Sequence, residues 1–193
     1  MKYHLLLGLA PALALAACGG NDTATTNAAM ADNMSGMDMP ADANAAGDAM
    51  ATAVSPAQKF ANDVGASDWF EIEAGKLAQE KAHDQKFKDF GKMMVEHHTA
   101  STDKLKTAGA KATPAITPNP ALNAEQEANL AALRSADGAA FDTAYKAQQI
   151  AAHEKALTAV KGYAASGDVP ELKKFAGDAE KVVQAHLTKI KGL

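Results

Sequence analysis

The chain has 193 residues, of which 47% are hydrophobic and 22% charged, and its formal net charge at pH 7 is −4. A mildly acidic chain without a basic block is a poor partner for nucleic acid and for anionic lipid surfaces. The chain contains a single cysteine, which excludes an internal disulfide framework, and its length suits one globular domain.

The N-terminus has the organisation of an export signal over residues 1–17. Lys2 supplies a positive charge, and residues 5–16 form an apolar stretch that is too short to span a bilayer comfortably. The residues that end at Cys18 resemble the lipobox of bacterial lipoproteins, in which the cysteine is lipidated and becomes the mature N-terminus. Gly19 stands in place of the aspartate that retains such lipoproteins in the inner membrane. The resemblance implies an outer-membrane lipoprotein that faces the periplasm; an ordinary signal peptide containing a cysteine is the alternative.

Residues 18–56 are predicted to be a flexible, disordered tether. Their composition is Ala, Asn, Asp, Thr, Gly and Met without an aromatic residue, so they cannot bury enough apolar surface to offset the entropy of ordering. The tether carries methionines at Met30, Met34, Met37 and Met39. Thioethers are soft ligands that prefer Cu(I), so this segment is a candidate copper-binding site, and a bare spacer is the alternative.

The remaining residues, 57–193, are predicted to form an all-α domain, because alanine, leucine and lysine abound and β-branched runs are absent. A proline-rich connection over residues 113–120 separates two helical hairpins. The expected long helices are 57–82, 85–110, 139–165 and 170–191, with a short helix at 124–135 that Asn123 caps. Two tight hairpins joined by one long connection predict a ferritin-like four-helix bundle with a long crossover.

Ligand-type side chains fall on or near the inner face of each long helix. At about 100° per residue, His186 lies within the apolar stripe of its helix and Glu71 shares the inner side of the first helix. His97 and His98 flank the stripe of the second helix on opposite sides, and His153 lies on the shoulder of the third stripe. Counting residues from the turns places Glu71, His98 and His153 at one level and His186 about one turn away.

Two interpretations of this cluster stay open. A site of Glu71, His98, His153 and His186 would suit copper, zinc, iron or manganese better than calcium, because three of the ligands are imidazoles. Alternatively, the same side chains form a structural hydrogen-bond network with Tyr145 and Gln149. A di-iron centre is disfavoured, because a carboxylate three residues before each histidine is missing; those positions hold Val95, Ile150 and Val183.

Several spaced motifs between about Phe60 and Leu193 resemble a bacterial family known as domain of unknown function 4142. The motifs are Phe70-Glu71-Ile72-Glu73, Lys76-Leu77-Ala78, Met93-Met94-Val95-Glu96-His97-His98-Thr99, Phe141-Asp142, Tyr145, His153 and His186-Leu187. The resemblance implies a ferritin-like four-helix fold, an exported or outer-membrane location and no established activity. It also implies that His98, rather than His97, faces inward. His97 departs from the family pattern, in which aspartate is more common at this position, so it either adds a ligand or replaces a surface charge. From its position alone, Asp142 is explained as a first-turn acid favoured by the helix dipole.

The leading functional interpretation is a lipid-anchored, periplasm-facing envelope protein with a non-enzymatic binding or maintenance role. The alternative is a transition-metal-binding protein that uses the Glu/His cluster, the methionine tether or both. A degenerate ferritin-like redox enzyme is the least favoured of the three. No phosphate loop or nucleophile motif supports another enzyme class, and the sequence identifies no protein partner.

Overall fold

The computed structural model describes residues 54–193, which form five α-helices and no named strand. The helices are α1 (Pro56–Lys81), α2 (Gln85–Lys111), α3 (Ala124–Ser135), α4 (Gly138–Ser166) and α5 (Pro170–Gly192). The prediction of an all-α helical bundle is confirmed, and each predicted helix is present with ends displaced by no more than one residue. The predicted signal peptide, Cys18 and the four tether methionines lie outside the described residues. Among those that are described, no helix is long and apolar enough to be a membrane span.

Local sequence determines where the helices begin. Ser55 caps α1 by accepting a hydrogen bond from the backbone N–H of Gln58 at 3.1 Å, and Pro56 occupies the first helical turn, where its missing N–H costs nothing. Asn123 and Gln126 form the predicted capping box at the start of α3, with both reciprocal bonds at 3.0 Å. These caps fix where α1 and α3 begin.

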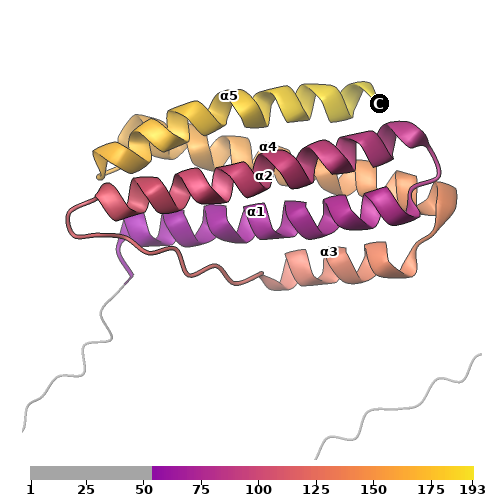
Figure 1. Cartoon of the computed structure of the whole chain (residues 1–193), viewed down its shortest axis with the longest axis horizontal. Coiled ribbons are helices and arrows are strands. Elements are labelled where there is room, and N and C mark those ends of the chain that lie inside the picture. Colours follow the sequence, from indigo (N-terminus) through magenta and orange to yellow (C-terminus); the bar gives the residue numbers. More distant parts are fainter. Residues whose placement is uncertain (1–53) are drawn as a thin grey trace, which may run out of the picture. The chain divides into compact units, whose positions relative to one another are not determined.

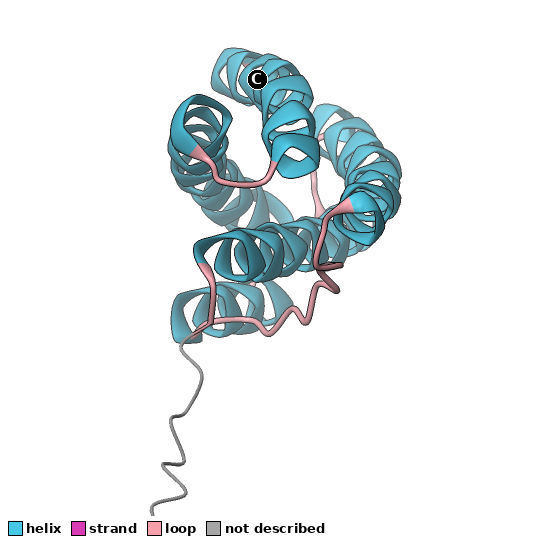
Figure 2. Ribbon diagram, turned by 90° about the vertical axis from the view of Figure 1, so that its left-hand side faces the viewer, coloured by secondary structure: helices cyan, strands magenta, loops and turns pink. Residues whose placement is uncertain are grey.

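The four long helices pack as two antiparallel hairpins, α1 with α2 and α4 with α5 (Figure 1). The hairpins meet where α1 packs on α4 and α2 packs on α5, and α3 lies against α1 and α4. Figure 2 shows the same bundle viewed along its helices. Helices α2 and α4 begin at the same end of the bundle, so the connection between them, which contains α3, traverses its length.

Asp142, which lies just after the first turn of α4, joins the two hairpins. Its two carboxylate oxygens accept hydrogen bonds from the backbone N–H groups of His83 and Asp84, each at 2.9 Å, in the turn between α1 and α2. The interpretation of Asp142 as an acid that serves only its own helix dipole is therefore wrong. Its carboxylate fixes the start of α4 beside the start of α2, and this register places His98 and His153 at one level.

The core consists of two apolar clusters separated by a buried polar layer. One cluster contains Phe70, Phe90, Met94, Phe141, Tyr145 and Leu187, and the other contains Phe60, Ala61, Leu105, Val160, Leu172 and Phe175. Each long helix has one end in each cluster. The middle of the four helices carries buried polar residues: Asp68, His98, Gln149, His153 and His186. Glu71, also buried, follows Phe70 on α1. Because desolvating so many polar groups is costly, this layer is the part of the bundle that packing alone does not explain.

The backbones of α1 and α2 approach closely beside this layer. A Cβ atom added to Gly75 would lie 2.6 Å from the carbonyl oxygen of Gly91, and one added to Gly91 would lie 2.6 Å from that of Gly75. Only glycine fits at both positions. The close approach holds Glu71, one turn before Gly75, near the bundle axis.

Candidate metal centre

Three buried imidazoles from three helices converge in the polar layer. His98 of α2, His153 of α4 and His186 of α5 each offer a ring nitrogen, and these nitrogens lie within 4.8 Å of one another. The expectation that His98 faces inward is confirmed, because this residue is 6% exposed and His97 is exposed. Counting residues places His186 about one turn away, an offset that helix tilt or the side chain can absorb, and its ring lies with the other two.

His98 is oriented by a buried carboxylate. Its Nδ1 lies 2.7 Å from Oδ1 of Asp68, whose other oxygen accepts a hydrogen bond from Thr102 at 3.3 Å. Burial acts to lower the pKa of His98, but the hydrogen bond with Asp68 and the charges of Glu71 and Asp68 outweigh it and raise that pKa. The Nε2 atom of His98 is buried and has no hydrogen-bond partner in the protein. The ring is therefore held by one nitrogen and presents the other to the cluster.

His153 is held in the same way by a backbone carbonyl. Its Nδ1–H donates to the carbonyl oxygen of Gln149 at 2.8 Å, and its Nε2 lies 3.3 Å from Nδ1 of His186. Burial lowers the pKa of His153, so the ring is neutral at pH 7 and Nε2 carries a lone pair. A ring fixed through Nδ1–H, with a free Nε2, is the usual state of a metal-ligating histidine.

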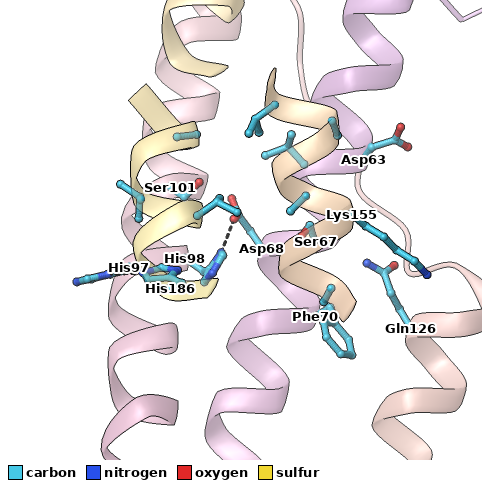
Figure 3. Close-up of a pocket in the computed structure, with 18 of the residues that line it drawn as sticks. Asp63, Ser67, Asp68, Phe70, His97, His98, Ser101, Gln126, Lys155 and His186 are labelled. Atoms are coloured by element: carbon cyan, nitrogen blue, oxygen red, sulfur yellow. Dashed lines mark hydrogen bonds and ion pairs between the residues drawn. The ribbon is translucent and has the colours of Figure 1, made fainter. Parts of the chain in front are cut away.

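His186 connects the buried cluster to an exposed fourth imidazole. Its Nε2 lies 2.8 Å from Nδ1 of His97, and the two rings are stacked with their centroids 5.1 Å apart. Figure 3 shows His97, His186 and His98 together, with His98 bonded to Asp68. Burial, followed by the neighbouring imidazoles, lowers the pKa of His186 to about 2, so this ring too is neutral at pH 7.

The hydrogen bonds assign the direction of this chain of rings. The Gln149 carbonyl can only accept, so the proton of neutral His153 is on Nδ1 and its Nε2 accepts from Nδ1–H of His186. The Nε2 of His186 then accepts from Nδ1–H of His97. In the metal-free protein His186 thus presents its lone pair outward, toward His97.

Glu71 lies beside the three imidazoles, not among them. Its Oε1 is 3.7 Å from Nδ1 of His153, the nitrogen that does not face His186, and its side chain is almost fully buried. Its Oε2 has no hydrogen-bond partner in the protein, and the same holds for the hydroxyl of Tyr145 and both side-chain polar atoms of Gln149. Burial, with the charge of Glu71, raises the pKa of Tyr145 well above its usual value. The expected structural network is thus present only in part: His153 bonds His186, but the Tyr145 hydroxyl and the Gln149 side chain bond neither Glu71 nor a histidine.

A cavity of about 440 Å³ reaches the cluster from one side of the bundle. Its wall includes His97, His98 and His186 together with Asp68, and small apolar side chains of α4 and α5 line much of the rest (Figure 3). His153 does not line this cavity. His98 and His186 therefore border this cavity together with the exposed His97, although both rings are themselves buried.

The separation of the ring nitrogens fits a small metal ion. Nitrogens bound at about 2.0 Å in tetrahedral geometry lie about 3.3 Å apart. That is the distance between Nε2 of His153 and Nδ1 of His186, and one ring nitrogen from each of the three histidines lies within 4.8 Å of the others. Of the predicted ligands, the structure thus brings together His98, His153 and His186 and sets Glu71 behind His153.

Two residues of the site, Asp68 and His97, are absent from the ligands predicted from the sequence. Asp68 continues the inner spacing 64-68-71-75-78 of α1, a signal present in the sequence. His97 is exposed, and nothing in the helical pattern shows that it touches His186. Its contact depends on how α5 packs against α2.

Comparison with solved structures identifies proteins of similar fold. CopM in its Ag-bound form aligns with a TM-score of 0.57 at 18% identity, covering 70% of this chain and 93% of CopM. The Cu(I)-bound and Cu(II)-bound forms of CopM give TM-scores of 0.58 and 0.57 at 19% and 20% identity, with the same coverage. At this identity the likeness concerns the fold. No curated protein matches the sequence.

The sequence also matches a family profile over most of its length. The profile is described as a domain of unknown function, DUF4142, and the match extends over residues 40–193. This range includes every helix and all the residues of the polar layer. The resemblance seen in the sequence motifs is thereby confirmed, and the chain belongs to the DUF4142 family.

Proposed function

We propose that the protein binds a divalent transition-metal ion, copper in preference to zinc, through His98, His153 and His186. The observation that carries this proposal is the orientation of the rings. His98 and His153 are each fixed through Nδ1 by a buried acceptor, the Nε2 of His153 lies 3.3 Å from Nδ1 of His186, and the buried Nε2 of His98 has no protein partner. This combination of ligand and orienting partner is characteristic of histidine metal sites.

Unsatisfied polar atoms favour this function over a purely structural network. In a structural network the buried polar groups hydrogen-bond one another, because each unmade bond costs about 1–3 kcal/mol. Here the Nε2 of His98 and the Oε2 of Glu71 lack protein partners. A bound ion would take up the lone pair of His98, and its positive charge would stabilise Glu71.

Charge and ligand type favour a divalent ion. Asp68 and Glu71 place two carboxylates in or beside the site, so a divalent ion balances the buried charge when the imidazoles are neutral. Nitrogen sites bind Cu²⁺ more strongly than Zn²⁺ and the earlier divalent metals, and no sulfur ligand lies among the three converging atoms. The structural likeness to CopM, solved in copper-bound and silver-bound forms, supports copper as the first metal to test.

The test is metal analysis of the full chain without a polyhistidine tag. After removal of metal by a chelator and titration with Cu(II), Zn(II), Fe(II) or Mn(II), we expect one copper ion per chain that survives dialysis. A matched variant replaces Met30, Met34, Met37 and Met39 with leucine, which tests the methionine tether separately. Copper retained by this variant supports the bundle site. Copper lost with the methionines assigns binding to the tether, and absence of binding in both proteins refutes the proposal.

We also propose that Cys18 anchors this metal-binding bundle to the outer membrane on its periplasmic side. The support is the lipobox-like sequence that ends at Cys18 and the glycine that follows it. In a Gram-negative host, a Cys18→Ser variant is expected to lose incorporation of radiolabelled palmitate and to move from the outer-membrane fraction to the soluble periplasmic fraction. A variant that still labels and still fractionates with the outer membrane would contradict the anchor.

A further inference from the structure

The metal site needs a route from solvent, because its three imidazoles are 6%, 1% and 3% exposed. Among the described residues, His97 is an exposed histidine that contacts this cluster directly, through the 2.8 Å contact with His186. His97 and His186 both line the cavity that leads to the site. An exposed imidazole, His97, is thus in direct contact with a buried imidazole of the proposed site, His186.

The two ring nitrogens of His186 contact different partners, one buried and one exposed. Its Nδ1 faces His153 within the buried cluster, and its Nε2 faces His97 at the surface. In the metal-free tautomer assigned above, the lone pair is on Nε2, so an ion that arrives from solvent meets the outward nitrogen first. Nitrogens bound at right angles at about 2.0 Å lie about 2.8 Å apart. The separation of His97 Nδ1 and His186 Nε2 equals this value, and the exposed His97 side chain lies at the surface end of the contact.

We infer that His97 and His186 Nε2 form an outer metal position through which a divalent ion reaches the buried three-histidine site. Binding at the outer position moves the Nδ1 proton of His97 to its solvent-facing Nε2. In the transfer step the bond from the ion to His186 Nε2 breaks and a bond to Nδ1 forms. The proton leaves Nδ1 and returns to Nε2 through solvent, so the step conserves protons and changes no oxidation state. The inference rests on the proposed metal-binding function.

A loading route has a kinetic signature that a structural or orienting role lacks. If copper enters and leaves through the outer position, removing that position slows copper association and copper dissociation by the same factor. The dissociation constant for copper then does not change. A positioning role for His97, in which it accepts Nε2–H of metal-bound His186, predicts instead faster dissociation and weaker affinity. A surface residue without either role changes neither rate.

The experiment is stopped-flow mixing of the metal-free full chain with Cu(II), followed by quenching of tryptophan fluorescence. Trp69 is the single tryptophan and directly follows Asp68 on α1, and its emission is the signal that is followed. Dissociation is measured by mixing the copper-loaded protein with excess chelator. His97→Ala is compared with His83→Ala, which removes another exposed histidine and serves as the control.

We expect His97→Ala to slow both association and dissociation by about tenfold or more, with one copper ion still bound and an unchanged dissociation constant. His83→Ala should match the wild type. Unchanged rates in His97→Ala would overturn the inference, and so would weaker affinity caused by faster dissociation alone. Failure of the wild type to bind copper would instead refute the proposed function, which keeps the two claims separable.

Discussion

Replacing His153 with alanine is expected to abolish stoichiometric binding of copper while the bundle remains folded. Among the described residues, His153 supplies one of three converging nitrogens, and its loss leaves the buried site with two imidazoles, too few ligands to retain an ion through dialysis. The hydrogen bond of His153 Nδ1–H goes to a carbonyl of its own helix, but the variant also removes the imidazole that lies 3.7 Å from the buried Glu71 carboxylate. Loss of metal from a variant that is still folded can therefore be attributed to the missing ligand.

The measurement is metal content after dialysis, with circular dichroism of the metal-free protein as the test of folding. His83→Ala, which removes an exposed histidine outside the cluster, is the control and should retain one ion per chain. A folded His153→Ala protein that still holds one copper ion would show that the metal is bound elsewhere, with the methionine tether as the first alternative.

Helix boundaries are predictable from this sequence because strong local signals mark them. Proline in the first turns of α1 and α5 and the capping box before α3 each act within a few residues. The prolines over residues 113–120 prevent the second helix from continuing, and this effect depends on local sequence alone. Such signals determine where a helix begins, and the apolar stripe determines which side faces the core.

The arrangement of the site depends on packing that counting residues does not include. A rise of about 1.5 Å per residue places His98 and His153 at one level, and the structure agrees. The same count sets His186 one turn away, yet its ring centroid lies 5.4 Å from that of His153. Tilt between packed helices shifts side chains along the bundle axis by amounts that the sequence does not encode locally.

The roles of Asp68 and His97 illustrate two kinds of missed information. Asp68 follows the inner spacing of α1, and a count that gives weight to buried acids beside buried histidines would have found it. His97 has no such signal, because an exposed residue on the shoulder of α2 is ordinary until α5 places His186 against it. Asp68 could thus be predicted from the sequence, whereas the contact of His97 with His186 could be found only from the structure.

Replacing His98 with alanine is expected to lower the free energy of unfolding of the metal-free protein by about 3 kcal/mol. The reason is the carboxylate that remains: the Asp68 side chain is 4% exposed, and without His98 its remaining hydrogen bond comes from Thr102 at 3.3 Å. A buried charge without its partner costs more than the lost contact alone. His97→Ala, at an exposed position, should cost less than about 1 kcal/mol.

A double-mutant cycle separates the ion pair from simple loss of packing. Urea denaturation in the presence of a chelator gives the free energies of unfolding for His98→Ala, Asp68→Ala and the double variant. If the two residues stabilise each other, the double variant should lose less than the sum of the single losses, by about 1 kcal/mol or more. Additive losses would show that His98 and Asp68 act independently. Helix packing, and not the hydrogen bond to Asp68, would then orient the His98 ring. The main structural argument that His98 is held ready to bind a metal would be lost.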